Sequence, residues 1–152
     1  MKVTVKRTIE ASSDVIWNYL GDFSNIHRFH PFLKSSHFIN DSQTCEVGST
    51  RQCDFKDGST FQEQISEWVE GAHYTIDIVG STGPIKEGSG TLGVTSIGTN
   101  KSEVYMTLDV VPPNKIAQPM MFLMFRYKVI PAILKKLEKL SLHAHQQKPL
   151  AA

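Results

Sequence analysis

The sequence lacks the features that mark a disulfide-rich, secreted or membrane-spanning protein. Its only cysteines are Cys45 and Cys53, which we expect to remain free thiols. The longest uninterrupted apolar run, Met120 to Phe125, has six residues, whereas a membrane-spanning helix needs about 20. No apolar leader follows Met1, so the sequence predicts a cytoplasmic protein without integral membrane association.

Strong net charge and familiar catalytic motifs are also missing. Lys and Arg number 16 and Asp and Glu 15, which gives no long-range attraction to nucleic acid. No glycine-rich phosphate loop opens a helix, and no Gly-x-Ser-x-Gly elbow presents a serine nucleophile. His27 and His30 are three positions apart, but zinc needs at least a third protein ligand and none is fixed beside them. We therefore expect neither a metal nor another cofactor, and we interpret His30-Pro31 as part of a structural turn.

What the sequence does contain is an ordered succession of strand and helix patterns. Alternating residues predict a strand over 3–9, and a capped apolar stripe predicts a helix over 12–21. A second short helix is predicted over 24–29, before a proline that disfavours helix. From 34 to 111, β-rich stretches about ten residues apart predict a meander of about six antiparallel strands, with Asp57-Gly58 as a hairpin turn.

The last predicted element is a long amphipathic helix over 119–142, which Pro131 should bend. Apolar residues at 3–4 spacing should face the core, namely Leu123, Tyr127, Ile130, Leu134 and Leu137. This order of elements predicts an α+β fold, with a curved antiparallel sheet of about seven strands around the long helix. We expect one domain over 1–143 and a flexible tail over 144–152.

Three segments resemble the START-like (SRPBCC) superfamily, in its polyketide cyclase/dehydrase and lipid-transport branch. The segment 9–17 is similar to the family's opening "A-s-x-x-V-W" helix, and 21–31 resembles its "D-F-x-N-x-x-x-W-H-P" segment. Residues 48–51, followed by Asp57-Gly58 and 61–65, resemble "G-x-x-R … D-G-x-x-x-E-x-x". The resemblance covers roughly 3 to 140 and implies a helix-grip fold that encloses a cavity for a small, largely apolar molecule.

The resemblance also implies positions that line this cavity. Phe32-Leu33-Lys34-Ser35 is similar to an "F-I-K-S" segment of the hormone-receptor branch, in which the lysine meets an acidic ligand group, and this points to Lys34. The other polar positions that it implies are Arg51, Glu63, Glu87 and Ser89, the last two less directly because the preceding loop differs in length. The implied inward or wall positions are Cys53, Phe55, Ile76, Ile78, Met106 and Leu108.

The alternation of the strands supports part of this lining independently of the resemblance. Met106 and Leu108 alternate with polar residues, as do Tyr74, Ile76 and Ile78 in another strand, so each strand has one apolar face. Such faces suit either a cavity wall or a filled core. The expected lining is completed by Phe61 from a third strand and by the helix residues Leu123, Tyr127, Ile130 and Leu134.

Arg51 and Glu63 are predicted on faces that also carry Phe55 and Phe61. A charge inside an apolar core costs several kcal/mol unless it is paired or hydrated, which favours an ion pair or a wet cavity. The alternative is that one or both side chains face solvent.

Two functions fit this pattern. In the first, the protein binds a small hydrophobic molecule whose acidic or carbonyl group lies near Lys34 and Arg51. In the second, it is a polyketide cyclase or dehydratase, in which Lys34 or Arg51 polarises a carbonyl and Glu63 or Tyr74 moves a proton. A protein-interaction module is a weaker third interpretation.

The run Met120–Phe125 is apolar all round its helix. It either packs against the N-terminal helices or forms an exposed patch. A patch would serve a homodimer, a membrane surface or ligand entry.

Overall fold

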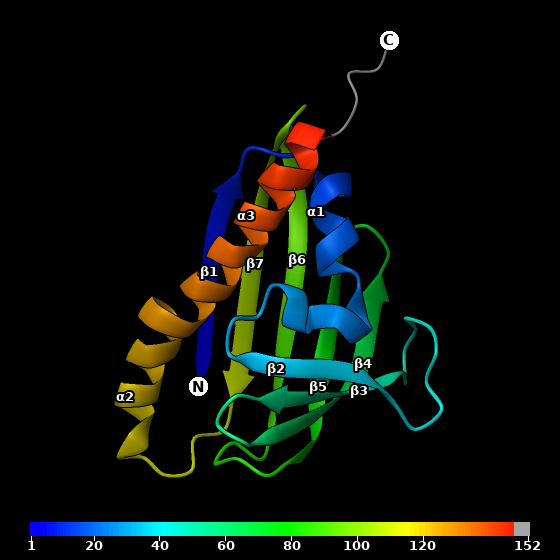
Figure 1. Cartoon of the computed structure of the whole chain (residues 1–152). Coiled ribbons are helices and arrows are strands. Elements are labelled where there is room, and N and C mark those ends of the chain that lie inside the picture. The colour runs from blue at the N-terminus through cyan, green and yellow to red at the C-terminus, as the bar shows by residue number, and fades with distance from the viewer. Residues whose placement is uncertain (148–152) are drawn as a thin grey trace.

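The computed structural model describes residues 1–147, which form one seven-stranded sheet and a long helix that crosses it (Figure 1). The strand order is β1-β7-β6-β5-β4-β3-β2, and every neighbouring pair is antiparallel. The strands are β1 Lys2–Ile9, β2 Leu33–Ile39, β3 Thr50–Phe55, β4 Thr60–Val69, β5 His73–Ser81, β6 Gly88–Gly98 and β7 Lys101–Val110. The predicted meander of six strands after the short helices is confirmed.

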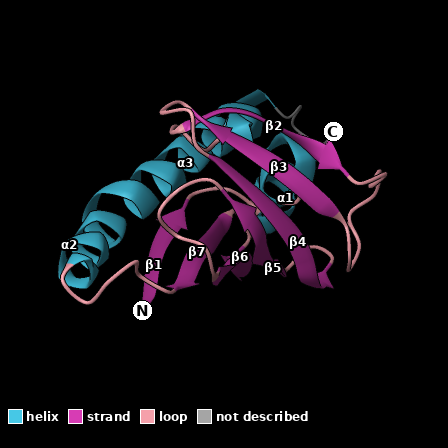
Figure 2. Ribbon diagram, turned by 90° about the horizontal axis from the view of Figure 1, so that it is seen from below, coloured by secondary structure: helices cyan, strands magenta, loops and turns pink. Residues whose placement is uncertain are grey.

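Two short helices follow β1, and one long helical segment ends the described chain. The short ones are α1 Ser13–Leu20, capped by the Ser12 side chain, and the 3-10 helix η1 Phe23–Arg28. The long segment comprises α2 Ala117–Met124, the π-helical turn η2 Phe125–Val129 and α3 Ile130–Gln147. Figure 2 shows the sheet curling from β1 round to β2, with the long helix along its open side. The predicted fold, a curved sheet that grips the C-terminal helix, is confirmed.

The space between sheet and helix is filled at one end only. At that end α1 packs against α3 and β6, and buried side chains including Ile16, Leu20, Leu134 and Leu137 form a solid core. Trp17, Trp68 and Tyr74 add an aromatic cluster, in which the Trp68 and Tyr74 rings stack with centroids 5.1 Å apart. The other end, under α2 and η2, contains the cavity described below.

The Asp57-Gly58 turn that joins β3 to β4 forms as predicted. Gly58 has φ +92°, a left-handed conformation that glycine adopts without strain. The Asp57 carboxylate accepts hydrogen bonds from the Ser59 amide and hydroxyl, which closes the turn. This tight turn brings Asp57 and Ser59 to the rim of the cavity.

The long helix differs from its prediction in extent and in the face that it presents. It spans residues 117–147 instead of 119–142, so it includes 144–147, which we expected in a flexible tail; residues 148–152 of that tail lie outside the described part of the chain. Ile130, Leu134 and Leu137 are buried as predicted, but Leu123 and Tyr127 are 56% and 71% exposed. Placing these two residues in the core was wrong.

The π-helical turn η2 explains this error. In η2 the backbone hydrogen bonds join residues five positions apart instead of four. An example is the bond from the Ile130 amide to the Phe125 carbonyl. The helix before η2 is therefore rotated relative to a regular α-helix projected back from α3. Pro131, which lacks an amide hydrogen, is the second residue after this wide turn.

Over residues 1–147, none of the helices is both long and apolar enough to cross a membrane.

Candidate functional site

A cavity of about 330 Å³ lies between the concave face of the sheet and the α2–η2–α3 helix. Nine of the sequence-predicted residues line it: Arg51, Phe55, Phe61, Glu63, Ile76, Ile78, Ser89, Met106 and Leu108. Cys53, which the resemblance also placed inward, lines it too. The sequence analysis did not predict the helix residues Met124, Phe125, Lys128, Val129 and Ile133 or the segment residues Ile26, His30, Phe32, Leu33 and Ile85. Most of this wall is apolar, and its few polar groups are grouped on one side and at the mouth.

Seven of the predicted site residues lie elsewhere. Lys34 and Glu87 are exposed, and so are Leu123 and Tyr127. Ile130 and Leu134 are buried in the solid part of the core, outside the cavity lining. Tyr74 is fully buried behind Arg51, and the guanidinium carbon lies 5.8 Å from its ring centroid.

Strand alternation explains the position of Lys34. Leu33 is buried and lines the cavity, so the next side chain of β2 points the other way. The pairing of β2 with β3 also shifts register between Leu33 and Ser35, which makes Lys34 the unpaired residue of a bulge. Lys34 therefore cannot meet a ligand inside the cavity.

Arg51 and Glu63 form a buried ion pair at the cavity wall. They face each other on β3 and β4, and both Nε and Nη2 of Arg51 contact Glu63 Oε2, at 2.8 and 2.7 Å. The Arg51 side chain is 1% exposed and that of Glu63 14%. The predicted pairing of these two residues, left open beside a solvent-facing alternative, is the arrangement found.

The remaining donors and the ring contacts of Arg51 hold the guanidinium in place. Nη1 donates to the Phe23 carbonyl at 2.8 Å, and the guanidinium carbon lies 4.2 Å from the Phe23 ring centroid. Burial alone would lower the pKa of Arg51, but the negative charge of Glu63 raises it above its ordinary value, so the group stays charged. Arg51 is therefore committed to protein partners, and the expected contact of its guanidinium with an acidic ligand loses its support.

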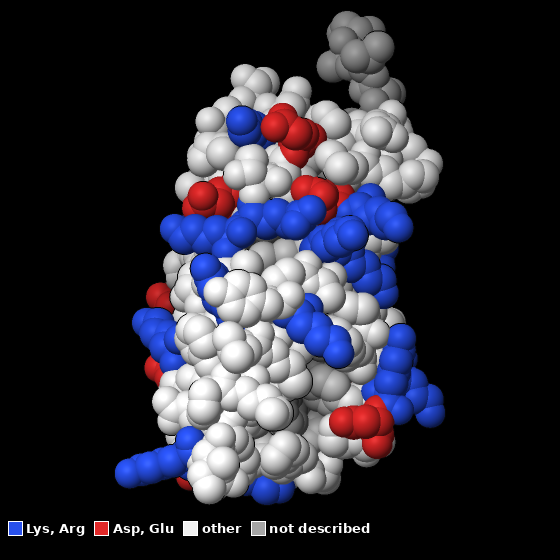
Figure 3. Space-filling model, turned by 90° about the vertical axis from the view of Figure 1, so that its left-hand side faces the viewer, with Lys and Arg blue, Asp and Glu red and all other residues white. Residues whose placement is uncertain are grey.

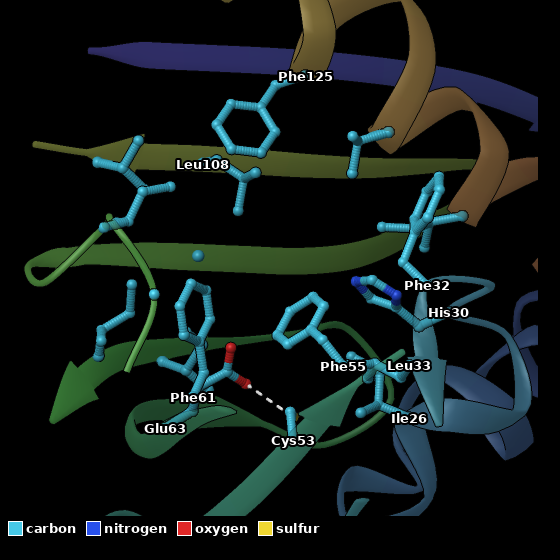
Figure 4. A pocket seen from close by; sticks show the side chains of 18 of the residues that line it. Ile26, His30, Phe32, Leu33, Cys53, Phe55, Phe61, Glu63, Leu108 and Phe125 are labelled. Carbon is cyan, nitrogen blue, oxygen red and sulfur yellow. Dashed lines mark hydrogen bonds between the residues drawn. The ribbon is translucent and has the colours of Figure 1, made fainter. Parts of the chain in front are cut away.

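Glu63 presents its second oxygen to the cavity. Its contacts with Arg51 use Oε2, as does the weak 3.7 Å contact from the Cys53 thiol. Figure 4 shows the other carboxylate oxygen directed toward the space between Phe61 and Phe55. Register shifts on both sides of Glu63, at Gln62/Glu63 and Ile65/Glu67, locally break the regular pairing of β4 with β5. A carboxylate oxygen in this position can accept a hydrogen bond from a ligand.

His30 is the polar cavity residue that the sequence analysis missed. Its ring projects into the cavity beside Phe55 and Phe32, with ring centroids 5.8 and 6.1 Å away (Figure 4). Nδ1 is buried and has no hydrogen-bond partner among the described residues. Burial, with a smaller effect of the Arg51 charge, lowers the pKa of His30 to about 3, so the imidazole is neutral. The signal that could have identified it is the apolar setting of Phe29-His30-Pro31-Phe32.

The buried neutral His30 should make the protein less stable in acid. The unfolded chain takes up a proton near pH 6.5, whereas the folded state resists it down to about pH 3. Between these values the unfolded state binds more protons, so the free energy of unfolding should fall as the pH drops, by at most about 1.4 kcal/mol per unit. His30→Phe keeps an aromatic ring beside Phe55 and should flatten this slope in urea titrations between about pH 7 and pH 5.

His37→Gln is the matched control, because this histidine is exposed on β2. Its slope should equal that of the unaltered protein. An unchanged slope in His30→Phe would show that the folded state accommodates the protonated ring.

In the part of the chain that the structure describes, the Cys53 thiol and the histidines do not form an arrangement typical of a nucleophile or a metal site. Burial, followed by the nearby Glu63 carboxylate, raises the pKa of the Cys53 thiol well above its ordinary value, so the thiol stays protonated. His27 Nδ1 lies 2.7 Å from the Ser36 hydroxyl, a contact that ties η1 to β2. Within the described residues, no three His, Cys, Asp or Glu side chains are grouped to hold a metal ion.

The cavity reaches the surface between three segments. Its exposed lining residues are Asp57 in the β3–β4 turn, Pro84 in the β5–β6 loop, and Met124 and Lys128 on the helix. The mouth thus combines one acidic and one basic side chain with apolar atoms. A ligand that enters here passes between α2–η2 and the two loops.

Sequence comparison identifies one family model over nearly the whole chain. The model described as "Polyketide cyclase / dehydrase and lipid transport" matches residues 1–144. A comparison with curated proteins found no match.

Solved structures of similar fold come from several bacteria. The protein XoxI from Bacillus cereus has a TM-score of 0.79 at 21% identity, with 93% of this chain and 95% of that chain covered. A Thermobifida fusca protein has a TM-score of 0.79 at 19% identity, with 94% of each chain covered. A START superfamily protein from Mycobacterium smegmatis has a TM-score of 0.72 at 16% identity, with 96% and 97% covered. At these identities the similarity establishes the fold alone.

Proposed function

The chain belongs to the polyketide cyclase/dehydrase and lipid transport family, and from this premise we propose that it binds one small, largely apolar, uncharged molecule in its cavity. The observation that carries the proposal is the cavity itself. It occupies about 330 Å³, at the lower end of the range of about 300–1,000 Å³ typical of small-molecule sites. Its wall is mainly Phe, Ile, Leu and Met side chains, which an apolar ligand would shield from water.

The polar groups of the wall favour a ligand that donates a hydrogen bond. Glu63 offers a carboxylate oxygen, and the negative charge would repel a ligand carboxylate. Arg51 is already held by Glu63 and Phe23, and Lys34 lies outside. A hydroxyl or amide group near Glu63 fits this side of the cavity better than an acid, and the His30 imidazole can serve a second polar atom of the same ligand.

A second candidate function is a cyclase- or dehydratase-type enzyme that acts on such a ligand. The observation that favours it is that Glu63 and the neutral His30 line the same cavity, so a carboxylate that can move a proton and an imidazole that can orient the ligand by a hydrogen bond face one molecule. Arg51 would keep Glu63 in place rather than polarise a carbonyl itself. Tyr74, which lies behind Arg51, does not reach the ligand in this scheme.

Filling the cavity should abolish binding of an apolar probe. Leu108 lines the cavity, and the position of a Cβ on neighbouring Gly90 would lie 3.3 Å from Leu108 Cδ2, so the side chains here are close together. Leu108→Trp adds a bulky ring to this space and should lower the affinity for the neutral dye N-phenyl-1-naphthylamine by at least about tenfold. Fluorescence titration measures the effect.

Val79→Trp is the matched control, because this exposed β5 residue follows the cavity-lining Ile78 and points to the other face of the sheet. It should leave dye binding unchanged. Equal dye binding by Leu108→Trp and by the unaltered protein would contradict the cavity as the binding site. Native mass spectrometry of protein purified from its own host would then identify the class of any molecule that co-purifies.

A further inference from the structure

The outer face of α2 and η2 exposes an unusual amount of apolar surface. Ile116 is 90% exposed and Met120 76%, and Leu123, Met124 and Tyr127 are also exposed. Ile116, Met120, Leu123 and Tyr127 are spaced by four, three and four positions, so they form one exposed stripe, and Met124 lies beside it. In Figure 3, which views this side of the molecule, a broad area without charged side chains occupies the lower half. We call the stripe Ile116–Tyr127 the α2 patch.

The stretch of chain that carries the α2 patch has charges of one sign. From Val110 to Leu137 the chain contains no Asp or Glu, but it contains Lys115, Arg126, Lys128, Lys135 and Lys136. Lys128 and Lys135 are exposed farther along the same helical segment, so the exposed apolar residues of α2 are followed by exposed basic residues in η2 and α3. Blue side chains border the uncharged area in Figure 3.

Three acidic groups on the neighbouring strands and on α3 are already paired. Glu138 contacts Arg7 at 2.9 Å, Glu103 contacts Lys6 at 3.6 Å, and Asp109 lies 3.7 Å from the N-terminal ammonium. In contrast, Lys115, Lys128 and Lys135 form no ion pair with any described residue. The unpaired charges on the helical segment itself are therefore positive, and the exposed Asp57 lies across the cavity mouth from them.

We propose that the α2 patch docks the protein onto the surface of an anionic lipid bilayer. An apolar stripe flanked by lysines is the pattern by which a surface helix inserts its apolar side chains among acyl chains while its cations meet lipid phosphates. A second copy of the chain is a poorer occupant, because a two-fold contact would bring the same unpaired lysines of both copies together. The homodimer predicted through Met120–Phe125 therefore becomes the competing outcome.

The cavity mouth adjoins this surface. Met124 and Lys128 are exposed at the edge of the α2 patch and also line the cavity, so a docked α2 would bring the mouth to the lipid boundary. An apolar molecule dissolved in the bilayer would then enter without crossing bulk water. Docking itself does not depend on whether the cavity binds a ligand, so the two proposals can fail separately.

Vesicle sedimentation tests the docking. Vesicles of phosphatidylcholine with about one third phosphatidylglycerol should bind the full chain, and pure phosphatidylcholine vesicles should bind it more weakly. Met120→Asp combined with Leu123→Asp should reduce binding by at least about tenfold, because charged side chains insert poorly among acyl chains. Lys115→Gln combined with Lys135→Gln should reduce it by about fivefold for each lysine.

Matched controls separate docking from general changes in charge or exposure. Val79→Asp combined with Ile97→Asp alters exposed apolar residues on other strands, and Lys34→Gln combined with Lys101→Gln removes exposed cations elsewhere. Both pairs should bind vesicles as the unaltered protein does, and far-ultraviolet circular dichroism should show that all variants keep their fold.

Absence of binding to the anionic vesicles, or equal losses in the control pairs, would overturn the proposal. So would a dimer in sedimentation equilibrium that the Met120→Asp and Leu123→Asp pair dissociates, without vesicle binding by the unaltered chain. That result would assign the α2 patch to contact between two copies.

Discussion

Replacing Glu63 by alanine should lower the free energy of unfolding by about 3–5 kcal/mol. The substitution removes the only counter-charge in contact with Arg51 among the described residues, while the guanidinium remains 1% exposed between Phe23 and the cavity wall. Its bond to the Phe23 carbonyl cannot balance a full charge in this setting. Urea denaturation followed by circular dichroism measures the loss.

Three further variants show whether the loss comes from the orphaned charge. Glu63→Gln keeps an oxygen acceptor for Arg51 and should cost less than Glu63→Ala. Adding Arg51→Met to Glu63→Ala removes the unpaired guanidinium charge and should recover most of the lost free energy of unfolding. Glu67→Ala alters an exposed glutamate on the same strand and should change the free energy of unfolding by less than about 0.5 kcal/mol. A loss below about 1 kcal/mol in Glu63→Ala would mean that water in the cavity hydrates the guanidinium.

The strands could be predicted because their sequence carries two strong local signals. Alternation fixes which side chains face inward, and turn residues such as Asp57-Gly58 fix where the chain reverses. Ile76, Ile78, Met106 and Leu108 therefore lie at the cavity wall as predicted. The same rule applied at Leu33 turns Lys34 outward, against the inward position that the receptor-like segment implies.

The helix shows where a periodic argument fails. A spacing of three and four predicts one face only if every turn is regular, and the π-helical turn η2 breaks that condition. Residues after η2, such as Ile130 and Leu134, keep the predicted face, whereas Leu123 before it does not. The sequence of η2, Phe125–Val129, gives no local sign of the extra residue. That Phe125 and Val129 line the cavity, instead of the predicted Leu123 and Tyr127, could therefore not have been predicted.

The polar side of the cavity depends on contacts between distant segments. The sequence placed Arg51 and Glu63 on inward faces, but their pairing follows from the register of β3 on β4. The Phe23 carbonyl that anchors Arg51 comes from η1, 28 positions earlier in the chain. His30 became a cavity residue because η1 and the loop after it fold over the sheet and bury the ring, which local sequence does not reveal.

Glu63→Gln also distinguishes ligand binding from catalysis, because Arg51 contacts only one of the two carboxylate oxygens and the other faces the cavity. The amide oxygen can replace Oε2 as the acceptor for Arg51, which leaves the amide NH₂ group where Oε1 faced the cavity. A ligand hydroxyl can donate to Oε1 or accept from this NH₂ group, so binding should change by only about 0.5–1.5 kcal/mol. Isothermal titration with the molecule that co-purifies with the protein measures this change.

If Glu63 instead moves a proton, the same variant should bind its substrate nearly as before but lose turnover by about 10²–10⁴-fold. Single-turnover assays would detect the loss, and Glu67→Gln on the exposed face of β4 is the control that should retain full activity. A large loss of turnover with unchanged affinity assigns proton transfer to Oε1, because Arg51 still occupies the other acceptor. Unchanged affinity and unchanged chemistry would contradict both roles, and the polar contact of the ligand would then be sought at His30, the other polar group beside Phe55.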